Sequence, residues 1–340
     1  MEIDFVMCWV DGGDPVWQQK RCQYKGPHYQ HSDTRYREWG ILRYWFRAVE
    51  QYAPWVNHIY FITDGQCPEW LNLDSPKLTL VDHRDFIPHE HLPTFQANTI
   101  ELNLHRIKGL SEHFVFFNDD MYINAPIEPT YYYKDGLPCD ATLESLFLGR
   151  SYSPVDEWGI SLIDFCNTHV INAHFDRKTV VAQARCKWLG GYLGLKYQLQ
   201  ALIISLFGRR EFQHFYTPHN EKPFLKSVYK EAWEREPKML TQSCTRFREN
   251  TNLSSYFMRY WQLCTQRFTP TPPRFDRRKV YALSLRNIST IAACMHDDKV
   301  TSLCLNDASD ISREEFEAVK TQIQRLFAEK LPERSSFEKA

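Results

Sequence analysis

Short apolar runs alternate with amphipathic segments along the first 150 residues. Runs rich in β-branched and aromatic residues, each ended by turn-forming residues, predict strands over residues 3–10, 59–63, 78–81 and 114–117. Apolar residues at three- and four-residue spacing predict helices over residues 35–52 and 96–107. Strand–helix–strand alternation is typical of a largely parallel sheet covered by helices. The pattern therefore predicts an α/β fold.

The rest of the chain is predicted to be mostly helical at first and mixed afterwards. Helical spacing covers residues 159–175, 194–207, 224–235 and 253–268, and the following Thr-Pro-Thr-Pro-Pro at 269–273 predicts an irregular connector. Strands over 280–283 and 300–305, a helix over 288–295 and a last helix with a capping box at Ser312–Glu315 complete the pattern. We divide the chain into residues 1–150, a helical middle part 151–270, and residues 271–340, which are expected to complete the α/β core.

Composition narrows the class of protein. The chain has 340 residues, of which 43% are hydrophobic and 24% charged, so disordered and fibrous classes are excluded. A net charge of −1 leaves no overall basic field, and no nucleic-acid partner is expected. The apolar run at 202–207 is far shorter than the roughly 20 residues of a membrane span. Ten scattered cysteines without a CxxC pair favour reduced thiols in a cytoplasmic protein.

Acidic and amide side chains follow four of the predicted strands. In open α/β sheets, ligands bind at the carboxyl ends of the strands. Any one of these residues taken alone is more often a turn or helix-cap residue, but adjacent carboxylates repel one another unless a cation or donors compensate. Hard oxygen ligands suit Mg²⁺ or Mn²⁺, which commonly hold substrate phosphates. The residues are Asp11 and Asp14, Asp64, Asn118 with Asp119 and Asp120, and Asn306 with Asp307.

Two further groups are weaker candidates. Asn98, Glu101 and His105 share the side of the predicted helix 96–107 that lies opposite its apolar stripe. A glutamate four residues before a histidine can orient the imidazole, and an exposed helical pair is the alternative.

A second group lies in the helical middle part. His214 and His219 flank Phe-Tyr-Thr-Pro, and Arg246 and Arg248 follow about 30 residues later. Histidine is a good proton acceptor at neutral pH, and the arginine fork binds phosphate oxygens. With thirteen histidines in the chain, this spacing alone is a weak signal.

Several stretches together resemble the conserved regions of the Stealth family. Residues 3–6 and 9–15, with the run Trp-Val-Asp-Gly-Gly-Asp-Pro, resemble its first region. Residues 35–38, 42–47, 52–56, 63–71, 92–95, 100–107 and 117–121 resemble the second. Thr217-Pro218-His219, Arg246-Phe247-Arg248 and the run 304–307 resemble the third and fourth. The resemblance covers nearly the whole chain.

The family includes bacterial capsular and cell-wall polysaccharide phosphotransferases and the lysosomal-enzyme GlcNAc-1-phosphotransferase. The resemblance therefore implies transfer of a sugar 1-phosphate from a nucleotide sugar, with a UDP-sugar as the expected donor. The acceptor would be a hydroxyl of a glycan or lipid-linked oligosaccharide, and the products a phosphodiester and a nucleoside monophosphate. The fold it implies is a Rossmann-like sheet of the nucleotide-sugar transferase type. We expect a cytoplasmic enzyme with peripheral contact at the inner face of the plasma membrane.

The same resemblance implies roles for individual residues. Asp119, Asp120, Asn306 and Asp307 would hold Mg²⁺ or Mn²⁺, and His219, in preference to His214, would accept the proton of the acceptor hydroxyl. Arg248 would hold phosphate, as would Arg35 or Arg43, and Asp120 is expected to be catalytic together with His219 and Arg248. The expected substrate-binding residues are Trp9, Asp11, Gly12, Asp14, Arg35, Arg43, Asp64, Glu101, His105 and Arg246.

Two other functions remain open from the sequence. A metal-dependent glycosyltransferase also places carboxylates at a strand end beneath a nucleotide sugar, and it would release a nucleoside diphosphate. A carbohydrate-binding protein without catalytic activity would leave the metal and phosphate groups unexplained.

Overall fold

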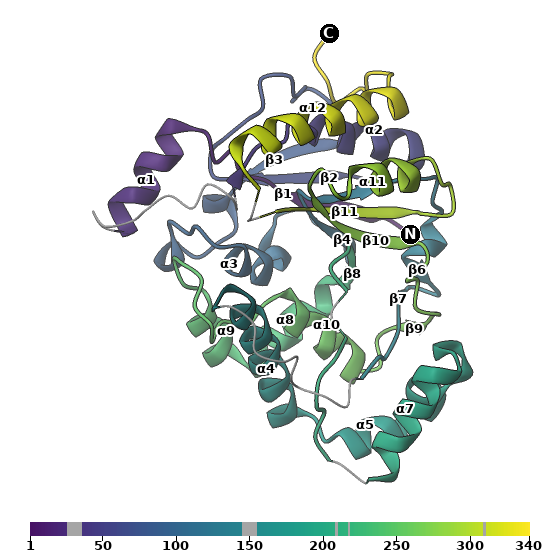
Figure 1. Cartoon of the computed structure of the whole chain (residues 1–340). Coiled ribbons are helices and arrows are strands. Elements are labelled where there is room, and N and C mark those ends of the chain that lie inside the picture. Colours follow the sequence, from purple (N-terminus) through teal and green to yellow (C-terminus); the bar gives the residue numbers. More distant parts are fainter. Residues whose placement is uncertain (26–35, 145–154, 208–209, 217, 309–310) are drawn as a thin grey trace.

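A five-stranded sheet forms the centre of the molecule (Figure 1). The computed structural model describes residues 1–25, 36–144, 155–207, 210–216, 218–308 and 311–340. The strand order is β3-β2-β1-β4-β8, and the first four strands are parallel while β8 runs antiparallel to β4. The strands are β1 (Ile3–Cys8), β2 (Ile59–Thr63), β3 (Leu78–Asp82), β4 (His113–Asn118) and β8 (Lys222–Leu225). The predicted mainly parallel sheet is confirmed.

The burial of β1 and β2 accounts for their apolar sequences. Every residue of β2 is buried, and in β1 only Cys8 is partly exposed. Strands that are covered on both faces need nearly continuous apolar sequence, whereas strands with one wet face alternate. These two runs were therefore the easiest to predict.

Two smaller sheets flank the central one. The first has the order β10-β11-β5, with β10 (Arg278–Leu283) parallel to β11 (Ser302–Asp307) and β5 (Met121–Ile123) antiparallel to it. The C-terminal strands therefore extend the core through β5 and do not join the central sheet. The second joins β6 (Tyr133–Lys134), β7 (Leu137–Asp140) and β9 (Thr269–Pro270). The connector predicted at 269–273 is thus wrong at its start, where two residues form an edge strand beside β7.

Helices cover both faces of the central sheet. Figure 1 shows α2 (Leu42–Tyr52) and α12 (Arg313–Lys330) on one side and α3 (Ala97–Leu102), α8 (Lys226–Arg235) and α10 (Ser255–Cys264) on the other. The remaining helices are α1 (Pro15–Lys25), α4 (Val155–His174), α5 (Arg177–Gln183), α6 (Arg185–Leu189), α7 (Leu195–Leu206), α9 (Pro237–Ser243) and α11 (Ile288–Met295). One large apolar core contains residues from Ile3 to Phe337. No helix in the described part of the chain is both long and apolar enough to span a bilayer.

Three helix predictions need correction. The helix predicted from residue 35 begins only at Leu42. The helix predicted at 224–235 begins at Lys226, because residues 222–225 pair with β4 as strand β8. The helix predicted at 96–107 ends at Leu102 and is followed by a separate 3-10 turn, Leu104–Arg106. These boundaries depend on tertiary packing, and the spacing of apolar residues alone does not determine them.

Candidate functional site

The site forms where the ends of β4 and β11 meet. Strand β4 ends at Asn118 and β5 begins at Met121, so Asp119 and Asp120 form the tight turn between them. Strand β11 runs antiparallel to β5, and the Leu305 amide donates to the Asp120 carbonyl oxygen at 2.8 Å. The end of β11 therefore lies beside this turn. The two predicted acidic strand ends come together through β5, although β4 and β11 belong to different sheets.

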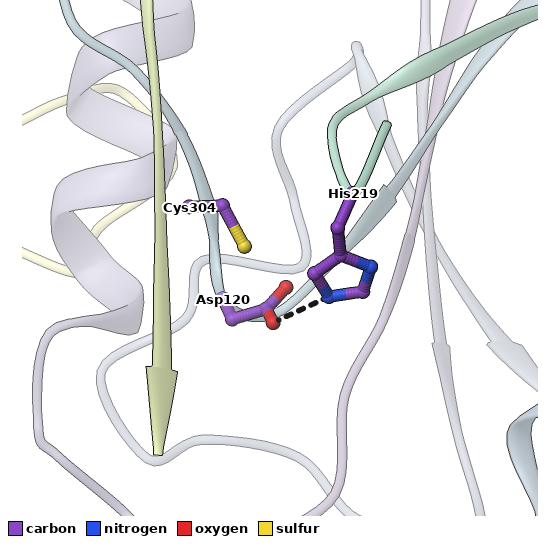
Figure 2. Close-up of side chains that lie close together, drawn as sticks. All are labelled: Asp120, His219 and Cys304. Atoms are coloured by element: carbon purple, nitrogen blue, oxygen red, sulfur yellow. Dashed lines mark hydrogen bonds and ion pairs between the residues drawn. The ribbon is translucent and has the colours of Figure 1, made fainter. Parts of the chain in front are cut away.

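Of the two candidate histidines, His219 reaches this turn. Its Nε2 lies 3.1 Å from Oδ2 of Asp120, and Figure 2 shows the imidazole directed at that carboxylate. His214 instead lies with Nε2 3.8 Å from Oδ2 of Asp164, on helix α4. The geometry thus separates the two histidines that the sequence left as alternatives.

The segment that carries His219 is anchored on both sides. The Tyr256 hydroxyl donates to the Pro218 carbonyl at 2.9 Å. Glu221 is buried, accepts a 2.6 Å hydrogen bond from the Ser302 hydroxyl and lies 3.3 Å from Nη2 of Arg278. These contacts tie the segment to α10 and to the β10-β11-β5 sheet, so they fix the imidazole relative to Asp120.

The charge state of Asp120 determines what His219 can do. Burial alone would raise the pKa of Asp120, but interactions with His219, and after them with the Cys304 thiol and Lys222, outweigh it and leave the pKa below its usual value. An ionised carboxylate can only accept, so Nε2 of His219 carries the shared proton. In the neutral imidazole, Nδ1 is then an acceptor. The pair has the arrangement of a base held in one tautomer by a carboxylate.

Two more carboxylates at this edge have raised pKa values, for different reasons. Desolvation, Asp120 and Glu38 raise the pKa of Asp119 to about 8. Because Asp119 is exposed to solvent, water screens part of the rise in its pKa, so the conclusion is only that the pKa is raised. Burial raises the pKa of Asp307 to about 6, against the charge of Arg37, whose Nη1 lies 3.6 Å from Oδ1 of Asp307.

Carboxylate oxygens at this edge could hold a hard divalent cation, although Asp119, Asp120 and Asp307 do not form a group of three within 4.8 Å of one another. Oδ1 of Asp120 and both carboxylate oxygens of Asp307 are buried and accept no well-formed hydrogen bond from the described residues, although the Cys304 thiol interacts with Asp120 and Arg37 lies 3.6 Å from Oδ1 of Asp307. Buried acceptors with incomplete hydrogen bonding are costly, and a cation would satisfy them. Carboxylates whose protonation is favoured by mutual repulsion would be stabilised in the ionised form by the same cation.

Cys304 is the third side chain of a group with Asp120 and His219, and its protonation state bears on which metal could bind. One ligand atom from each of Asp120, His219 and Cys304 lies within 4.8 Å of the other two (Figure 2). Burial, and after it the charge of Asp120, raises the pKa of Cys304 well above its usual value, and Sγ lies 3.1 Å from Oδ1 of Asn306, to which it donates. Cys304 is therefore a neutral thiol, which leaves oxygen and imidazole donors for the cation.

Lys222 is a cation beside the site that the sequence did not indicate. Its side chain is buried on β8, with Nζ 5.3 Å from the ring centre of Phe116 and 4.9 Å from that of Tyr256. Burial lowers the pKa of Lys222, whereas the charges of Glu101 and Asp120 oppose that effect. Its place three residues after His219 was the available signal, but it precedes the helix predicted at 224–235, and a single lysine in such a place is usually solvent-exposed.

Trp9, Asp11 and Arg43, three predicted substrate-binding residues, line one cavity of about 200 Å³ at the end of β1. Glu38 and Trp70 also line it, and the Trp9 indole donates to Oε2 of Glu38 at 3.0 Å. Arg43 lies over the Trp70 ring at 5.5 Å. Glu38 also raises the pKa of Asp119, so this cavity and the carboxylate turn are electrostatically linked.

Three predicted acidic residues hold the backbone in place. Gln66 donates to the Asp11 carbonyl and to Oδ2 of Asp14, both at 2.9 Å. The side chains of Asp11 and Asp14 accept from nearby backbone amides. Asp64 forms an ion pair with Lys20 of α1 at 2.6 Å. These contacts match the turn-and-cap alternative, and they fix the loop that carries Gly12.

The remaining predicted residues are not placed in contact with Asp120 or His219 by any described interaction. His105 is buried against Tyr229 and Trp233, with ring centres 5.8 and 6.0 Å away. Glu101 is also buried, so the alternative of an exposed helical pair is wrong. Arg246 donates to the carbonyls of residues 92 and 93.

Arg248 is exposed on the same segment as Arg246, between α9 and α10. Arg35 lies outside the described residues.

Comparison with known proteins identifies the family. The model for Stealth protein CR2, conserved region 2, matches residues 35–139, which include β2, β3, β4 and the Asp119–Asp120 turn. The chain is 38% identical to the receptor polysaccharide phosphotransferase WefC of Streptococcus gordonii over 99% of both chains. It is 37% identical to the capsular polysaccharide phosphotransferase WcwK of Streptococcus pneumoniae, again over 99% of both. It is 35% identical to the exopolysaccharide phosphotransferase cps2G of Lactiplantibacillus plantarum, over 99% of this chain and 96% of that one.

The chain therefore belongs to the Stealth family. The resemblance recognised in the sequence is confirmed, and with it the prediction of a phosphotransferase enzyme.

Proposed function

We propose that this enzyme transfers a sugar 1-phosphate from a nucleotide sugar to a hydroxyl of a glycan acceptor during synthesis of a cell-surface polysaccharide. The donor we propose is a UDP-sugar, and the products are a phosphodiester and a nucleoside monophosphate. Full-length similarity to curated polysaccharide phosphotransferases supports the class of reaction. The Asp120–His219 pair, next to buried carboxylate oxygens that accept no well-formed hydrogen bond, is the observation that carries the proposal.

His219 is proposed as the general base. Asp120 fixes Nε2 as the protonated nitrogen, so Nδ1 can accept the proton of the acceptor hydroxyl as its oxygen attacks phosphorus. The oxygen between the sugar and phosphorus stays in place, and the bond from that phosphorus to the nucleoside monophosphate breaks. The proton ends on His219, and the leaving monophosphate takes the electron pair of the broken bond.

Positive charge must balance the phosphate charge in this reaction. Lys222 is proposed as a phosphate contact, since it is held beside Asp120 by two aromatic rings. Arg248 is kept as a second phosphate contact, on the resemblance of Arg246-Phe247-Arg248 to the family's third region.

We also propose that Asp119, Asp120, Asn306 and Asp307 hold Mg²⁺ or Mn²⁺. Bound there, the ion would neutralise phosphate charge and polarise the phosphoryl group. Oδ2 of Asp120 is engaged by His219, whereas Oδ1 is the oxygen available to the ion.

Trp9 and Arg43 are proposed to contact the donor in the cavity at the end of β1. This cavity combines indole faces with a guanidinium and lies at the carboxyl end of a parallel strand, where α/β folds bind nucleotides. A Rossmann-like, nucleotide-sugar transferase type of fold is proposed on the same grounds.

Release of nucleotide products distinguishes this function from the alternatives. The enzyme is incubated with a panel of nucleotide sugars, a glycan acceptor and Mg²⁺ or Mn²⁺, and the nucleotide product is measured. We expect the monophosphate of one donor; a diphosphate would instead identify a glycosyltransferase. The matched control compares His219→Ala, expected to lose activity, with His214→Ala, expected to keep it. Equal loss in both would contradict the role given to His219.

A further inference from the structure

Helix α7 turns an apolar face outward. Its exposed residues recur at helical spacing and so share one side of the helix. Leu206 is 85% exposed and Phe207, directly after the helix, 73% exposed. The α7 face consists of Leu195, Leu199, Leu202, Ile203, Leu206 and Phe207. Exposed leucines are common singly, but a continuous stripe of this kind marks a contact surface.

The opposite side of α7 fixes the helix to the protein. Ala201 and Ile204 are buried, and Ala201 packs in a small apolar cluster with Ala141, Leu143 and Leu193. The inner side of α7 therefore anchors the helix, and the residues of the α7 face are not needed for packing within this chain. In Figure 1, α7 lies at the end of the molecule opposite α12.

The sequence around α7 has one sign of charge. Residues 177–210 contain seven basic residues and no acidic residue, in a chain whose net charge is −1. Among them, Lys178, Arg185 and Lys196 are exposed. Arg210 is also exposed, but it forms an ion pair with Asp176 at 2.6 Å, and Asp176 and Glu211 bound the basic stretch. Lys196 follows Leu195 at the edge of the α7 face. An apolar helix face bordered by basic residues is the pattern of a helix lying in the interface of an anionic membrane.

We propose that the α7 face and the basic residues around it dock the enzyme on an anionic lipid membrane. The apolar side chains enter the interfacial layer of the bilayer, and the lysine and arginine side chains meet acidic head groups. A second copy of this chain is the other apolar partner to consider, but two copies would bring like charges together, which opposes that contact. The proposal goes beyond the proposed reaction, and its test requires no turnover.

Vesicle flotation tests the proposal directly. The full chain is mixed with phosphatidylcholine vesicles with or without phosphatidylglycerol, at about 0.1 M and about 1 M salt. The Debye screening length is about threefold shorter at the higher salt concentration. We expect flotation with phosphatidylglycerol vesicles at low salt and much less in the other three conditions. The double variant L199E/L206E should lower the partition coefficient at least about tenfold, because it removes apolar contact and adds repulsion.

The matched control is Val16→Glu on α1, where valine is 74% exposed but the neighbouring sequence is not one-sidedly basic. It should float like the unaltered enzyme. Turnover on a water-soluble acceptor should stay within about twofold in all these variants, which shows that they fold. Absence of flotation on phosphatidylglycerol vesicles would overturn the proposal. So would a concentration-dependent dimer, seen by light scattering, that L199E/L206E abolishes in the absence of vesicle binding.

Discussion

Gly12 supports the site through a close approach of two chain segments, and an added methyl group should disrupt it. In the native structure the backbone of Tyr36 crosses directly over Gly12. A Cβ at position 12 would lie 2.2 Å from Cβ and 2.3 Å from the carbonyl oxygen of Tyr36, whereas ordinary van der Waals contacts are 3.4–4 Å. Neither atom belongs to the flexible end of a side chain. In Gly12→Ala the Tyr36 backbone must therefore retreat by about 1 Å or more.

The shift would reach the site through the next two residues. Arg37 lies 3.6 Å from Asp307, and Glu38 accepts the 3.0 Å hydrogen bond from Trp9. A displacement of about 1 Å takes the second contact beyond hydrogen-bonding distance and separates the first charge pair. Misplacing site groups by 1 Å can cost about 10²-fold in rate, which corresponds to about 2.7 kcal/mol of activation free energy. We expect Gly12→Ala to lower kcat/KM by about that factor.

The assay measures nucleoside monophosphate release together with the thermal unfolding midpoint. The matched control is the neighbouring Gly13→Ala, whose Cβ would meet only Oδ1 of Asp11, at 3.1 Å, and should change kcat/KM by no more than about twofold. Cooperative unfolding should persist in both variants. Full activity in Gly12→Ala, or an equal loss in Gly13→Ala, would refute the reasoning.

Four further predictions concern the site and the core. His219→Ala should lower kcat by about 10²–10⁴-fold with donor affinity nearly unchanged, as measured by turnover and by donor titration; weakened donor binding at normal kcat would argue against a base. Chelation should abolish turnover and added Mg²⁺ or Mn²⁺ restore it, while Asp120→Asn should lose about 10²-fold or more; full turnover after chelation would exclude the metal. Lys222→Met, which keeps an apolar stem between the rings, should raise the donor KM at least about tenfold, and an unchanged KM would remove Lys222 from phosphate binding. Burial lowers the pKa of His83 to about 4 and that of His105 to about 3, both from 6.5. Because the unfolded chain then binds more protons, the free energy of unfolding should fall as pH drops from about 6.5 towards 4, and thermal unfolding that is flat over this window would contradict their burial as neutral rings.

The sequence allowed the central sheet to be predicted because its strands are nearly continuous apolar runs. Strand β8 was missed because its second half, Phe224 and Leu225, runs directly into α8 and reads as the start of the helix predicted at 224–235. Its antiparallel pairing with β4 depends on contacts more than 100 residues apart, which local spacing does not encode. The same pairing brings Lys222 beside Asp120, so the missed strand and the missed cation have one cause.

The acidic strand ends illustrate what local patterns can and cannot reveal. Asp120 and His219 were both predicted, and the structure brings them to 3.1 Å although 99 residues separate them. Asp64 follows a strand in the same way but pairs with Lys20. The two carboxylates differ in the side chain that another segment places beside them, which is His219 for Asp120 and Lys20 for Asp64. The two histidines differ in the same way, because His105 is buried among aromatic rings. Residue type and position at a strand end therefore indicated candidates, while long-range packing decides between them.

The fate of one oxygen atom tests the central claim most directly. A donor sugar nucleotide carrying ¹⁸O in the bridge between the anomeric carbon and phosphorus is converted in full, and the product glycan and released nucleotide are analysed by mass spectrometry and ³¹P NMR. Transfer of a sugar 1-phosphate predicts that the label stays in the new phosphodiester and that the nucleotide leaves as an unlabelled monophosphate. An unlabelled glycosidic bond together with an ¹⁸O-labelled nucleoside diphosphate would contradict the account and identify a glycosyltransferase.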